Sequence, residues 1–481
     1  MNFAIVRYLI GWMLGIESIF LLLPALTAVI YGEPELPAYL IAAAISLAGA
    51  ALLCHRKPKN TRFYAREGYV TVALCWLILA VIGALPFVLS REIPFFIDAL
   101  FETVSGFTTT GATILGDVEA LSHASMLWRC LTHWVGGMGV LVFMLIVLPL
   151  AGGQTIFLMR AESPGPSVSK MSPRMRDTAT ILYAIYFGLT VLQMILLLIG
   201  GMPLFDAICV SLGTAGTGGF GNWNDSIAHY NSAYLQNVIT VFMILFGINF
   251  SAYFLILTRK FRQAFRIEEI RVYLGVIFVF AGLIAFNVRP MFGSLRESFH
   301  HALFQVASII TTTGFSTVDF DQWPTFSRAL LVLLMFIGAC AGSTGGGIKC
   351  SRILLLGKSV KKELMCLIHP RLVRVNKMDG QRVPHEVMRS INVFVVAYAF
   401  IFILSLLIIS LNCEDLVTCF TSVATTLNNV GPGLSLCGPT CNFDFFPPLS
   451  KCVLIFDMLA GRLELFPMLL LFTPGTWQRN K

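Results

Sequence analysis

Long apolar runs separated by short polar segments recur from one end of the chain to the other, and this feature limits the possible folds more than any other. Each run can cross a hydrocarbon layer of about 30 Å at about 1.5 Å per residue. A backbone in lipid has to satisfy its own hydrogen bonds, so the runs are predicted to be helices. We expect ten spans, at residues 3–31, 37–54, 69–90, 126–150, 181–200, 232–258, 272–288, 327–356, 391–412 and 452–472. The sequence therefore predicts an all-α integral membrane protein with ten transmembrane helices.

Charged residues are scarce in this chain. Of its 481 residues, 56% are hydrophobic and 12% are charged, whereas soluble domains carry roughly 25% charged residues. No stretch is polar enough to form a soluble enzyme with a cofactor domain. The 34 Lys and Arg residues lie between apolar runs without a basic face interleaved with aromatic residues, so nucleic acid is not an expected partner. No Ser/His/Asp set, carboxylate pair or Cys/His cluster with metal-ligand spacing stands out, and we expect neither enzyme activity, nor a cofactor, nor a transition metal.

Basic residues are concentrated on one side of the predicted topology. Both termini and the loops 55–68, 160–177, 259–271 and 349–389 hold 27 of the 34 Lys and Arg residues but only eight acidic residues. The positive-inside rule places this side, with both termini, in the cytoplasm. The opposite loops hold fifteen acidic residues and six basic ones, which would raise the local concentration of cations at an outer mouth.

A short semi-apolar stretch recurs in four of the outer loops, at 94–108, 203–215, 298–311 and 413–426. Stretches of this length are too short to span a membrane, and they fit re-entrant half-helices that return towards the midplane. A helix, half-helix, helix unit therefore occurs four times in the same orientation after a two-helix preface. The predicted boundaries are 1–60 for the preface and 61–158, 159–262, 263–370 and 371–481 for the four pseudo-symmetric pore repeats.

Each half-helix is followed by a turn that contains glycine. The turns occupy residues 108–112, 215–220, 311–315 and 428–432. One glycine from each turn can be aligned at intervals of 107, 96 and 117 residues, namely Gly111, Gly218, Gly314 and Gly431. A four-fold arrangement would place the turns around one axis. The candidate filter residues are Thr109, Thr110, Gly111, Gly216, Thr217, Gly218, Thr312, Thr313, Gly314, Asn429, Val430 and Gly431.

The residue types of these turns suit a monovalent cation. Potassium filters replace the hydration shell of the ion with rings of carbonyl oxygens. Glycine permits positive φ, so that consecutive carbonyls can face one way, and threonine adds a hydroxyl oxygen on a stiff side chain. The C-termini of the half-helices carry roughly half a negative charge each and would favour a cation in the cavity below. One Thr-Thr-Gly would be an ordinary loop turn, but four at the ends of half-helices predict a selectivity filter.

A glycine-rich stretch, 342–347, interrupts the predicted span 327–356. Its glycines Gly345, Gly346 and Gly347 each cost a helix about 1 kcal/mol relative to alanine, so they predict an unwound intramembrane loop beneath the turns. Close packing of helices through small residues is the alternative. A phosphate-binding loop is disfavoured, because Lys349 is displaced by one residue from that motif and no strand precedes it.

Arg462 is a basic residue within the predicted span 452–472. A charge at bilayer depth costs about 2.5 to 3.5 kcal/mol by insertion scales, so it faces a protein interior, a partner or water. Two interpretations stay open. The guanidinium forms a buried ion pair with Asp457, Glu464 or Glu17, or it places a positive charge on the axis below the turns.

With these features the chain resembles the Trk/Ktr/HKT superfamily of potassium transport proteins. The resemblance covers essentially the whole chain and rests on the four turns, the 342–347 stretch, Arg462 and the two additional N-terminal helices. It implies potassium uptake across a bacterial inner membrane, with K+ as the transported ion and with Gly345 to Gly347 and Arg462 as the gate. It also implies a homodimer with one pore per protomer on a ring of TrkA-like, nucleotide-binding regulatory subunits. Gly111 stands where sodium-permeable members carry serine, which favours potassium.

Several questions stay open at this stage. Asn428, Asn429 and Val430 replace the three threonines of the first and third turns, so the four-fold symmetry is approximate. A cation-coupled secondary carrier, which moves potassium with protons or sodium, is the alternative function. Cys437 and Cys441 lie on the outer side and could form a disulfide in an oxidising compartment.

Overall fold

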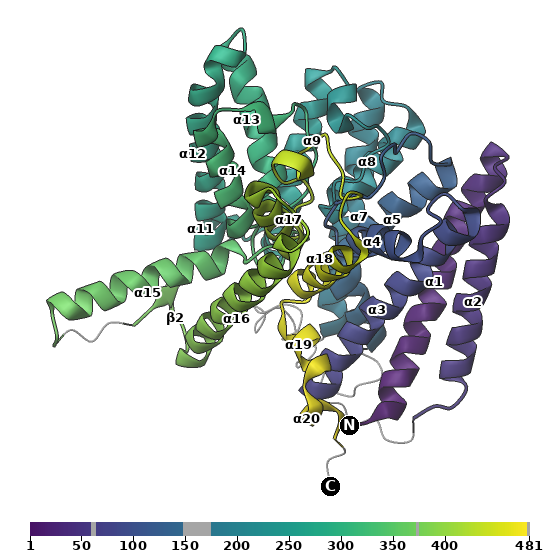
Figure 1. The fold of residues 1–481 in the computed structure, drawn as a ribbon. Coiled ribbons are helices and arrows are strands. Elements are labelled where there is room, and N and C mark those ends of the chain that lie inside the picture. The colour runs from purple at the N-terminus through teal and green to yellow at the C-terminus, as the bar shows by residue number, and fades with distance from the viewer. Residues whose placement is uncertain (59–63, 148–174, 372–374, 479–481) are drawn as a thin grey trace.

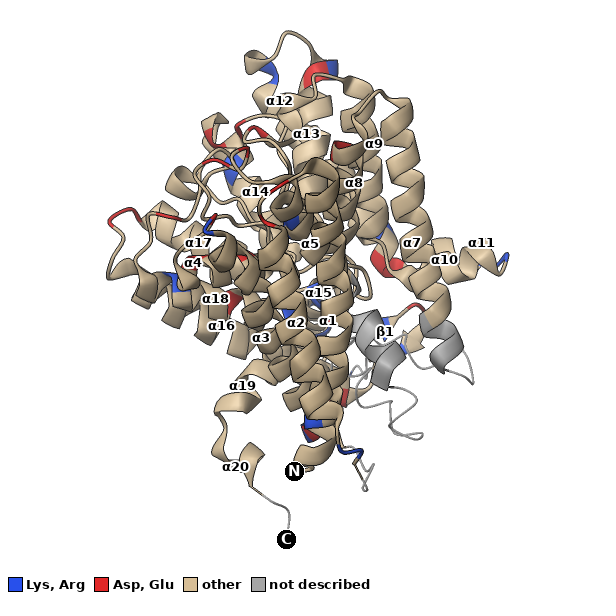
Figure 2. Ribbon diagram, turned by 90° about the vertical axis from the view of Figure 1, so that its right-hand side faces the viewer, with Lys and Arg blue, Asp and Glu red and all other residues tan. Residues whose placement is uncertain are grey.

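The computed structural model describes residues 1–58, 64–147, 175–371 and 375–478. Within these ranges every regular element is a helix, except for an antiparallel pair of two-residue strands, β1 (Lys377–Met378) and β2 (Gln381–Arg382). Short 3-10 helices occupy Ser226–His229, Arg289–Met291, Phe320–Gln322 and Ser435–Cys437. The charged residues lie mostly at the helix ends and in the loops (Figure 2). The predicted all-α architecture is confirmed, with this small hairpin as its one exception in the described residues.

Two helices at the N-terminus, α1 (Phe3–Tyr31) and α2 (Leu36–Cys54), run side by side at one edge of the molecule (Figure 1). Small residues allow their close approach. A Cβ at Gly11 would lie 2.6 Å from the Cys54 sulfur, and one at Gly49 would lie 3.1 Å from a methyl group of Leu14. α1 also packs against α3 (Ala65–Ser90) and α5 (His123–Val147).

After this pair, one order of elements occurs four times: a long helix, a short helix, a turn and a second helix. The long helices are α3 (Ala65–Ser90), α7 (Met175–Ile199), α12 (Glu268–Val288) and α16 (His385–Ser410). The short helices are α4 (Phe96–Phe107), α8 (Leu204–Gly216), α13 (Leu295–Ile310) and α17 (Leu416–Asn428). The second helices are α5 (His123–Val147), α9 (Ala233–Phe246) with α10 (Phe250–Leu257), α14 (Thr325–Ile337) with α15 (Cys350–Ile368), and α18 (Pro448–Arg462) with α19 (Phe466–Phe472). Two further helices are α11 (Phe261–Arg266) and α20 (Pro474–Trp477).

The predicted half-helices are confirmed as short helices of 12 to 16 residues. At about 1.5 Å per residue they are too short to cross a membrane. Their C-terminal halves are buried in the middle of the molecule. α15 instead extends away from the helix bundle, as Figure 1 shows on its left side.

Six of the described helices are long and apolar enough to cross a membrane: α1, α2, α3, α12, α16 and residues 180–199 of α7. The pair α9 and α10 passes the same criterion together, although the two helices meet at 92°. The predicted spans 327–356 and 452–472 are broken by irregular backbone after Ile337 and after Arg462. The predicted span 126–150 extends past Val147, beyond the described residues.

Each break has a local cause. Gly338 has φ of 69° directly after α14, and Glu464 and Leu465, which follow the C-cap of α18, have φ of 57° and 66°. Between α9 and α10, the side chain of Asn249 accepts a hydrogen bond from Ser251 N at 2.8 Å and so caps the new helix.

Cys437 and Cys441 do not form the disulfide that the sequence left open. Cys437 is buried, Cys441 is exposed, and both are free thiols. The 3-10 helix that contains Cys437 packs against α17.

Candidate functional site: four turns and a glycine-rich loop

The four turns share one unusual backbone conformation. Their left-handed residues have φ of 54° to 57° and are Thr109, Thr217, Thr312 and Asn429. Their glycines with positive φ, two positions later, have φ of 81° to 99° and are Gly111, Gly219, Gly314 and Gly431. A β-branched residue rarely adopts positive φ, and such strain costs about 1 to 3 kcal/mol. The occurrence of positive φ at three equivalent threonines indicates a functional site.

The second turn differs by one residue from the sequence alignment. The prediction aligned Gly218 with Gly111, but the glycine with positive φ is Gly219. The amide of Gly218 donates to the carbonyl five residues earlier, as the amide of Thr110 does in the first turn. The physical reason is that Gly216, which was expected in the turn, is still the last residue of α8. The equivalent segments are 109–111, 217–219, 312–314 and 429–431.

The four turns close into a ring through their glycines. A Cβ added to each glycine would collide with the carbonyl oxygen that precedes the glycine of the next turn. The distances from these Cβ positions to the oxygens are 2.0 Å from Gly111 to Gly218, 2.0 Å from Gly219 to Thr313, 2.5 Å from Gly314 to Val430 and 2.7 Å from Gly431 to Thr110. The sequence of contacts returns to its starting turn. No residue larger than glycine fits at these positions without moving a main-chain carbonyl.

Side chains reinforce the ring and accommodate the divergent fourth turn. The hydroxyls of Thr108 and Thr110 lie 2.8 Å apart, and those of Thr311 and Thr313 lie 2.7 Å apart in the same relation. In the fourth turn, Asn429 Nδ2 donates instead to Thr110 Oγ1 at 3.0 Å, which joins the last turn to the first. The predicted loss of strict symmetry is confirmed, and the amide compensates for it with a contact between turns.

His133 of α5 supports the ring, a role that was not predicted from the sequence. Its Nδ1 donates to Gly106 O at 2.7 Å, and its Nε2 accepts from Phe220 N at 3.1 Å. One buried imidazole thus links the end of α4 to the segment after the second turn. The available signal was an ionisable residue inside a predicted span, which marks a functional candidate.

A buried ion pair lies behind the first turn. Arg129 Nε is 2.8 Å from Glu102 Oε1, and the Arg129 guanidinium lies 4.1 Å from the centre of the Phe220 ring. Glu102 also accepts hydrogen bonds from Thr113 Oγ1 and Ile114 N. These contacts fix α4 to the chain that leaves the turn.

The glycine stretch lies in an irregular loop, residues 338–349, between α14 and α15. The predicted unwound loop is confirmed, and it abuts the turns. Gly346 N donates to Thr312 Oγ1 at 2.6 Å, and a Cβ at Gly346 would lie 2.6 Å from Asn428 O. A Cβ at Gly345 would lie 2.9 Å from Thr311 O. The glycines therefore serve close contact between loop and turns, and not the packing of two helices.

The break between α9 and α10 holds this loop in place. Phe246 O accepts from Thr344 Oγ1 at 3.2 Å, and Gly247 O accepts from Cys340 N at 3.1 Å. Phe250 N donates back to Gly342 O at 3.0 Å. The irregular backbone between α9 and α10 therefore provides hydrogen-bond partners for the irregular 338–349 loop of the next unit.

Glu269 of α12 anchors both ends of the loop. Its Oε1 accepts from Ala341 N at 2.7 Å and from Ser351 N at 3.0 Å. The ammonium of Lys349 donates to Gly345 O. Neither Glu269 nor Lys349 was predicted to lie at the site.

Arg462 connects the loop to the first unit. Its Nη1 donates to Thr344 O and its Nη2 to Gly136 O, both at 2.8 Å. Among the carboxylates expected as partners, Glu464 pairs with Arg352 at 2.5 Å and Asp457 accepts from Ser405 at 2.7 Å. The guanidinium therefore lies beside the loop and binds main-chain carbonyls.

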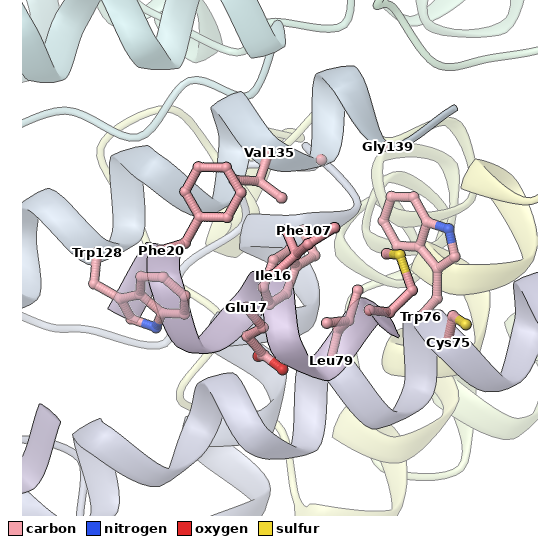
Figure 3. A pocket seen from close by; sticks show the side chains of 12 residues that line it. Ile16, Glu17, Phe20, Cys75, Trp76, Leu79, Phe107, Trp128, Val135 and Gly139 are labelled. Atoms are coloured by element: carbon pink, nitrogen blue, oxygen red, sulfur yellow. The ribbon is translucent and has the colours of Figure 1, made fainter. Parts of the chain in front are cut away.

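The third expected partner, Glu17, lies in a pocket behind the first short helix. The pocket is formed by α1, α3, α4 and α5, and Phe20, Trp76, Phe107 and Trp128 contribute its aromatic walls (Figure 3). Glu17 is buried in α1. The N-terminal helix pair thus packs against the outside of the unit that carries the first turn.

Comparisons with known proteins agree with this architecture. The family model described as "TrkH: Cation transport protein" matches residues 37–478. The chain is 38% identical to the Trk system potassium uptake protein TrkH of Salmonella typhimurium, across 99% of this chain and 100% of that protein. It is 33% identical to the Trk system potassium uptake protein TrkG of Escherichia coli, across 98% of both chains.

A solved structure is similar over the same length. The crystal structure of the potassium transporter TrkH from Vibrio parahaemolyticus superposes with a TM-score of 0.90 at 32% identity, covering 99% of this chain and 100% of that one. The expected resemblance and the expectation of a multi-pass membrane transporter, and not an enzyme, are confirmed. The chain belongs to the TrkH family of cation transport proteins.

Proposed function

We propose that this chain takes up potassium across the bacterial inner membrane through the ring of four turns. The observation that carries the proposal is the cyclic contact between each turn glycine and a carbonyl of the next turn. The names of the relatives, Trk system potassium uptake proteins, support the choice of ion.

The ring supplies the chemistry that a dehydrated potassium ion requires. Rings of main-chain carbonyls can replace the hydration shell, and the contacts between turns hold the carbonyls at fixed spacing. The proposed filter segments are 109–111, 217–219, 312–314 and 429–431, with Gly219 in the position that the alignment gave to Gly218. Acidic residues of the outer loops concentrate cations at the entrance.

The 338–349 loop and Arg462 form the proposed gate. Gly345 and Gly346 lie against the turns, Gly347 packs on Gly338 within the loop, and Arg462 donates to Thr344 O of the same loop. At an effective dielectric constant near 20, two unit charges about 4 Å apart interact by roughly 4 kcal/mol. A cation that leaves the ring therefore meets both a steric and an electrostatic barrier, to which Lys349 adds a second positive charge.

The wider assembly follows from the same proposal. Ten spans form a two-helix preface, 1–60, and four pseudo-symmetric pore repeats, 61–158, 159–262, 263–370 and 371–481, with the basic loops and both termini in the cytoplasm. The chain forms a homodimer with one pore per protomer. A cytosolic TrkA-like, nucleotide-binding subunit controls the gate through the basic loop 349–389.

Potassium flux in proteoliposomes tests this proposal. Purified protein is assayed with imposed potassium, sodium and proton gradients. Flux that follows the potassium electrochemical gradient alone supports a gated pore. Uptake that requires a proton or sodium gradient identifies the alternative, a cation-coupled secondary carrier, and absence of potassium flux contradicts both.

A further inference from the structure

A lateral arm leaves the helix bundle directly after the bend between α9 and α10, which is hydrogen-bonded to the 338–349 loop. The arm comprises α10, α11 and the residues between them, 250–266. α10 leaves α9 at 92°, and the two arm helices extend to the right-hand edge of the molecule in Figure 2. They pack on each other, with smaller contacts to α7 and α12.

The position of α12 places the outer part of the arm at a membrane surface. α12 is long and apolar enough to span, and it begins at Glu268, two residues after the end of α11. At the same end, Glu268 pairs with Lys358 of α15, and Glu268 N donates to Asp379 Oδ1 at 2.7 Å. α11 therefore lies where α12 enters the membrane, on the side with the basic loops.

The surface of the arm is both apolar and basic. Leu257, Phe261 and Phe265 are 65%, 52% and 69% exposed. Four exposed basic residues lie among them, namely Arg259, Lys260, Arg262 and Arg266. The ion pairs found among the described residues include none of these four. Aromatic side chains with neighbouring Lys and Arg are the composition of a segment that lies in a lipid interface.

The arm is covalently continuous with the support of the loop. Phe246 and Gly247, just before the bend, accept the hydrogen bonds of Thr344 and Cys340, and Phe250, the first residue of α10, donates to Gly342. An interaction that holds α10 in its direction would therefore also stabilise the three hydrogen bonds that join this bend to the 338–349 loop.

We propose that the arm 250–266 binds anionic phospholipid of the inner leaflet and thereby stabilises the loop-holding bend between α9 and α10. Arg259, Lys260, Arg262 and Arg266 bind the lipid phosphates, and Phe261 and Phe265 enter the acyl boundary. Lys and Arg near an anionic leaflet are each attracted to it. The inference that the arm binds lipid depends only on the surface chemistry of the arm, whereas the inferred effect on transport rests on the proposed function.

Lipid retention measures the binding directly. Native mass spectrometry of purified full-length protein, released from mixed phosphatidylglycerol and phosphatidylcholine, counts the bound lipids. The arm variant carries Arg259→Gln, Lys260→Gln, Arg262→Gln and Arg266→Gln, and it should retain at least about tenfold less phosphatidylglycerol. The matched control removes four charges from the other basic loop through Lys361→Gln, Lys362→Gln, Arg371→Gln and Arg389→Gln.

The control should retain the lipid nearly as well as the unaltered protein. A charge-preserving variant, Arg259→Lys with Arg262→Lys and Arg266→Lys, should also retain it, which separates charge from folding. Equal retention by the arm variant and the control would overturn the proposal. A change of oligomeric state or loss of regulatory-subunit binding in the arm variant, with lipid retention intact, would assign the surface to a protein partner and would overturn it too.

Transport gives the second readout. Potassium flux of the unaltered protein should change at least about threefold between phosphatidylcholine vesicles and vesicles containing phosphatidylglycerol, because the population of a loop state shifts with the free energy of lipid binding. The arm variant should lose this dependence. If the arm binds lipid but no protein form conducts potassium, the proposed function fails and the lipid site stands. If flux is normal but indifferent to lipid in all forms, the coupling between arm and loop is refuted.

Discussion

The exchange Gly314→Ser tests the ring at a contact whose geometry is known. A Cβ at residue 314 would lie 2.5 Å from Val430 O and 2.9 Å from Pro432 Cδ. Reaching even the 3.0 Å limit of real contacts requires the carbonyl and the turn to separate by about 0.5 Å. The residue would also have to hold φ near 89°, which adds about 1 to 3 kcal/mol of strain for a side chain other than glycine.

This strain would fall on a carbonyl of the proposed filter. A difference of about 1 to 3 kcal/mol corresponds to roughly 5- to 150-fold in an equilibrium constant. We therefore expect the preference for potassium over sodium to fall by about tenfold or more. Potassium and sodium fluxes of purified variants in proteoliposomes measure the ratio.

Gly275→Ser is the matched control, because Gly275 lies in α12 and a Cβ there meets nothing within 4 Å. The control should keep the selectivity of the unaltered protein. A monodisperse Gly314→Ser protein with unchanged selectivity would refute the ring as the filter.

Three further predictions concern the gate, the support of the ring and pH. Arg462→Ala should raise the potassium flux measured in the absence of the regulatory subunit by about one to three decades. Deletion of Gly345, Gly346 and Gly347 from the Arg462→Ala protein should raise the flux by less than the same deletion does in the unaltered protein, because the proposed barrier is shared. His133→Ala should lower the free energy of unfolding by about 2 kcal/mol or more, because two buried main-chain groups lose their partner, and thermal melting measures this change. Hydrogen bonds from the Thr418 hydroxyl and from backbone amides lower the pKa of Asp415 to about 2, so its stabilisation is complete above about pH 3.8 and is lost as pH falls towards 2. Asp415→Asn should melt earlier at neutral pH and lose that part of the acid dependence.

Each of these predictions has a result that contradicts it. Arg462→Ala protein of normal yield with unchanged or lower flux would exclude the barrier role, whereas poor folding with low flux would indicate a structural role. An unchanged melting temperature of His133→Ala would remove the imidazole from the support of the ring. The same acid dependence in Asp415→Asn as in the unaltered protein would assign that dependence to other carboxylates.

The helices and the approximate places of the turns were predictable because they depend on local composition. Apolar length alone separates the long first helix of each unit from the short helix that follows it. Three consecutive glycines disfavour a continuous helix by about 1 kcal/mol each. The resemblance to a potassium transport superfamily added the proposed role of Arg462 as part of the gate.

The register of the second turn was not predictable from residue types. Gly216, Gly218 and Gly219 all satisfy the pattern, and only the backbone shows which of them has positive φ. The bend within the predicted span 232–258 was missed for a similar reason. Gly247 and Asn249 each cost a helix only about 1 kcal/mol or less, which does not by itself predict a bend. The bend is stabilised by hydrogen bonds to a loop about a hundred residues away.

The partners of the site also depend on tertiary structure. His133, Glu269 and Lys349 make decisive hydrogen bonds to main-chain groups in other units, and a single sequence contains no signal for such pairings. The sequence showed that Arg462 is a rare charge within a predicted span. It did not show whether the guanidinium forms an ion pair or binds a main-chain carbonyl such as Thr344 O.

The central claim is that potassium binds within the ring of the four turns. Crystals of the protein grown with rubidium in place of potassium and measured at the rubidium absorption edge test it most directly. The account predicts an anomalous peak on the axis enclosed by Thr110, Gly218, Thr313 and Val430. Well-ordered crystals of transport-competent protein with rubidium bound elsewhere and none inside this ring would contradict it.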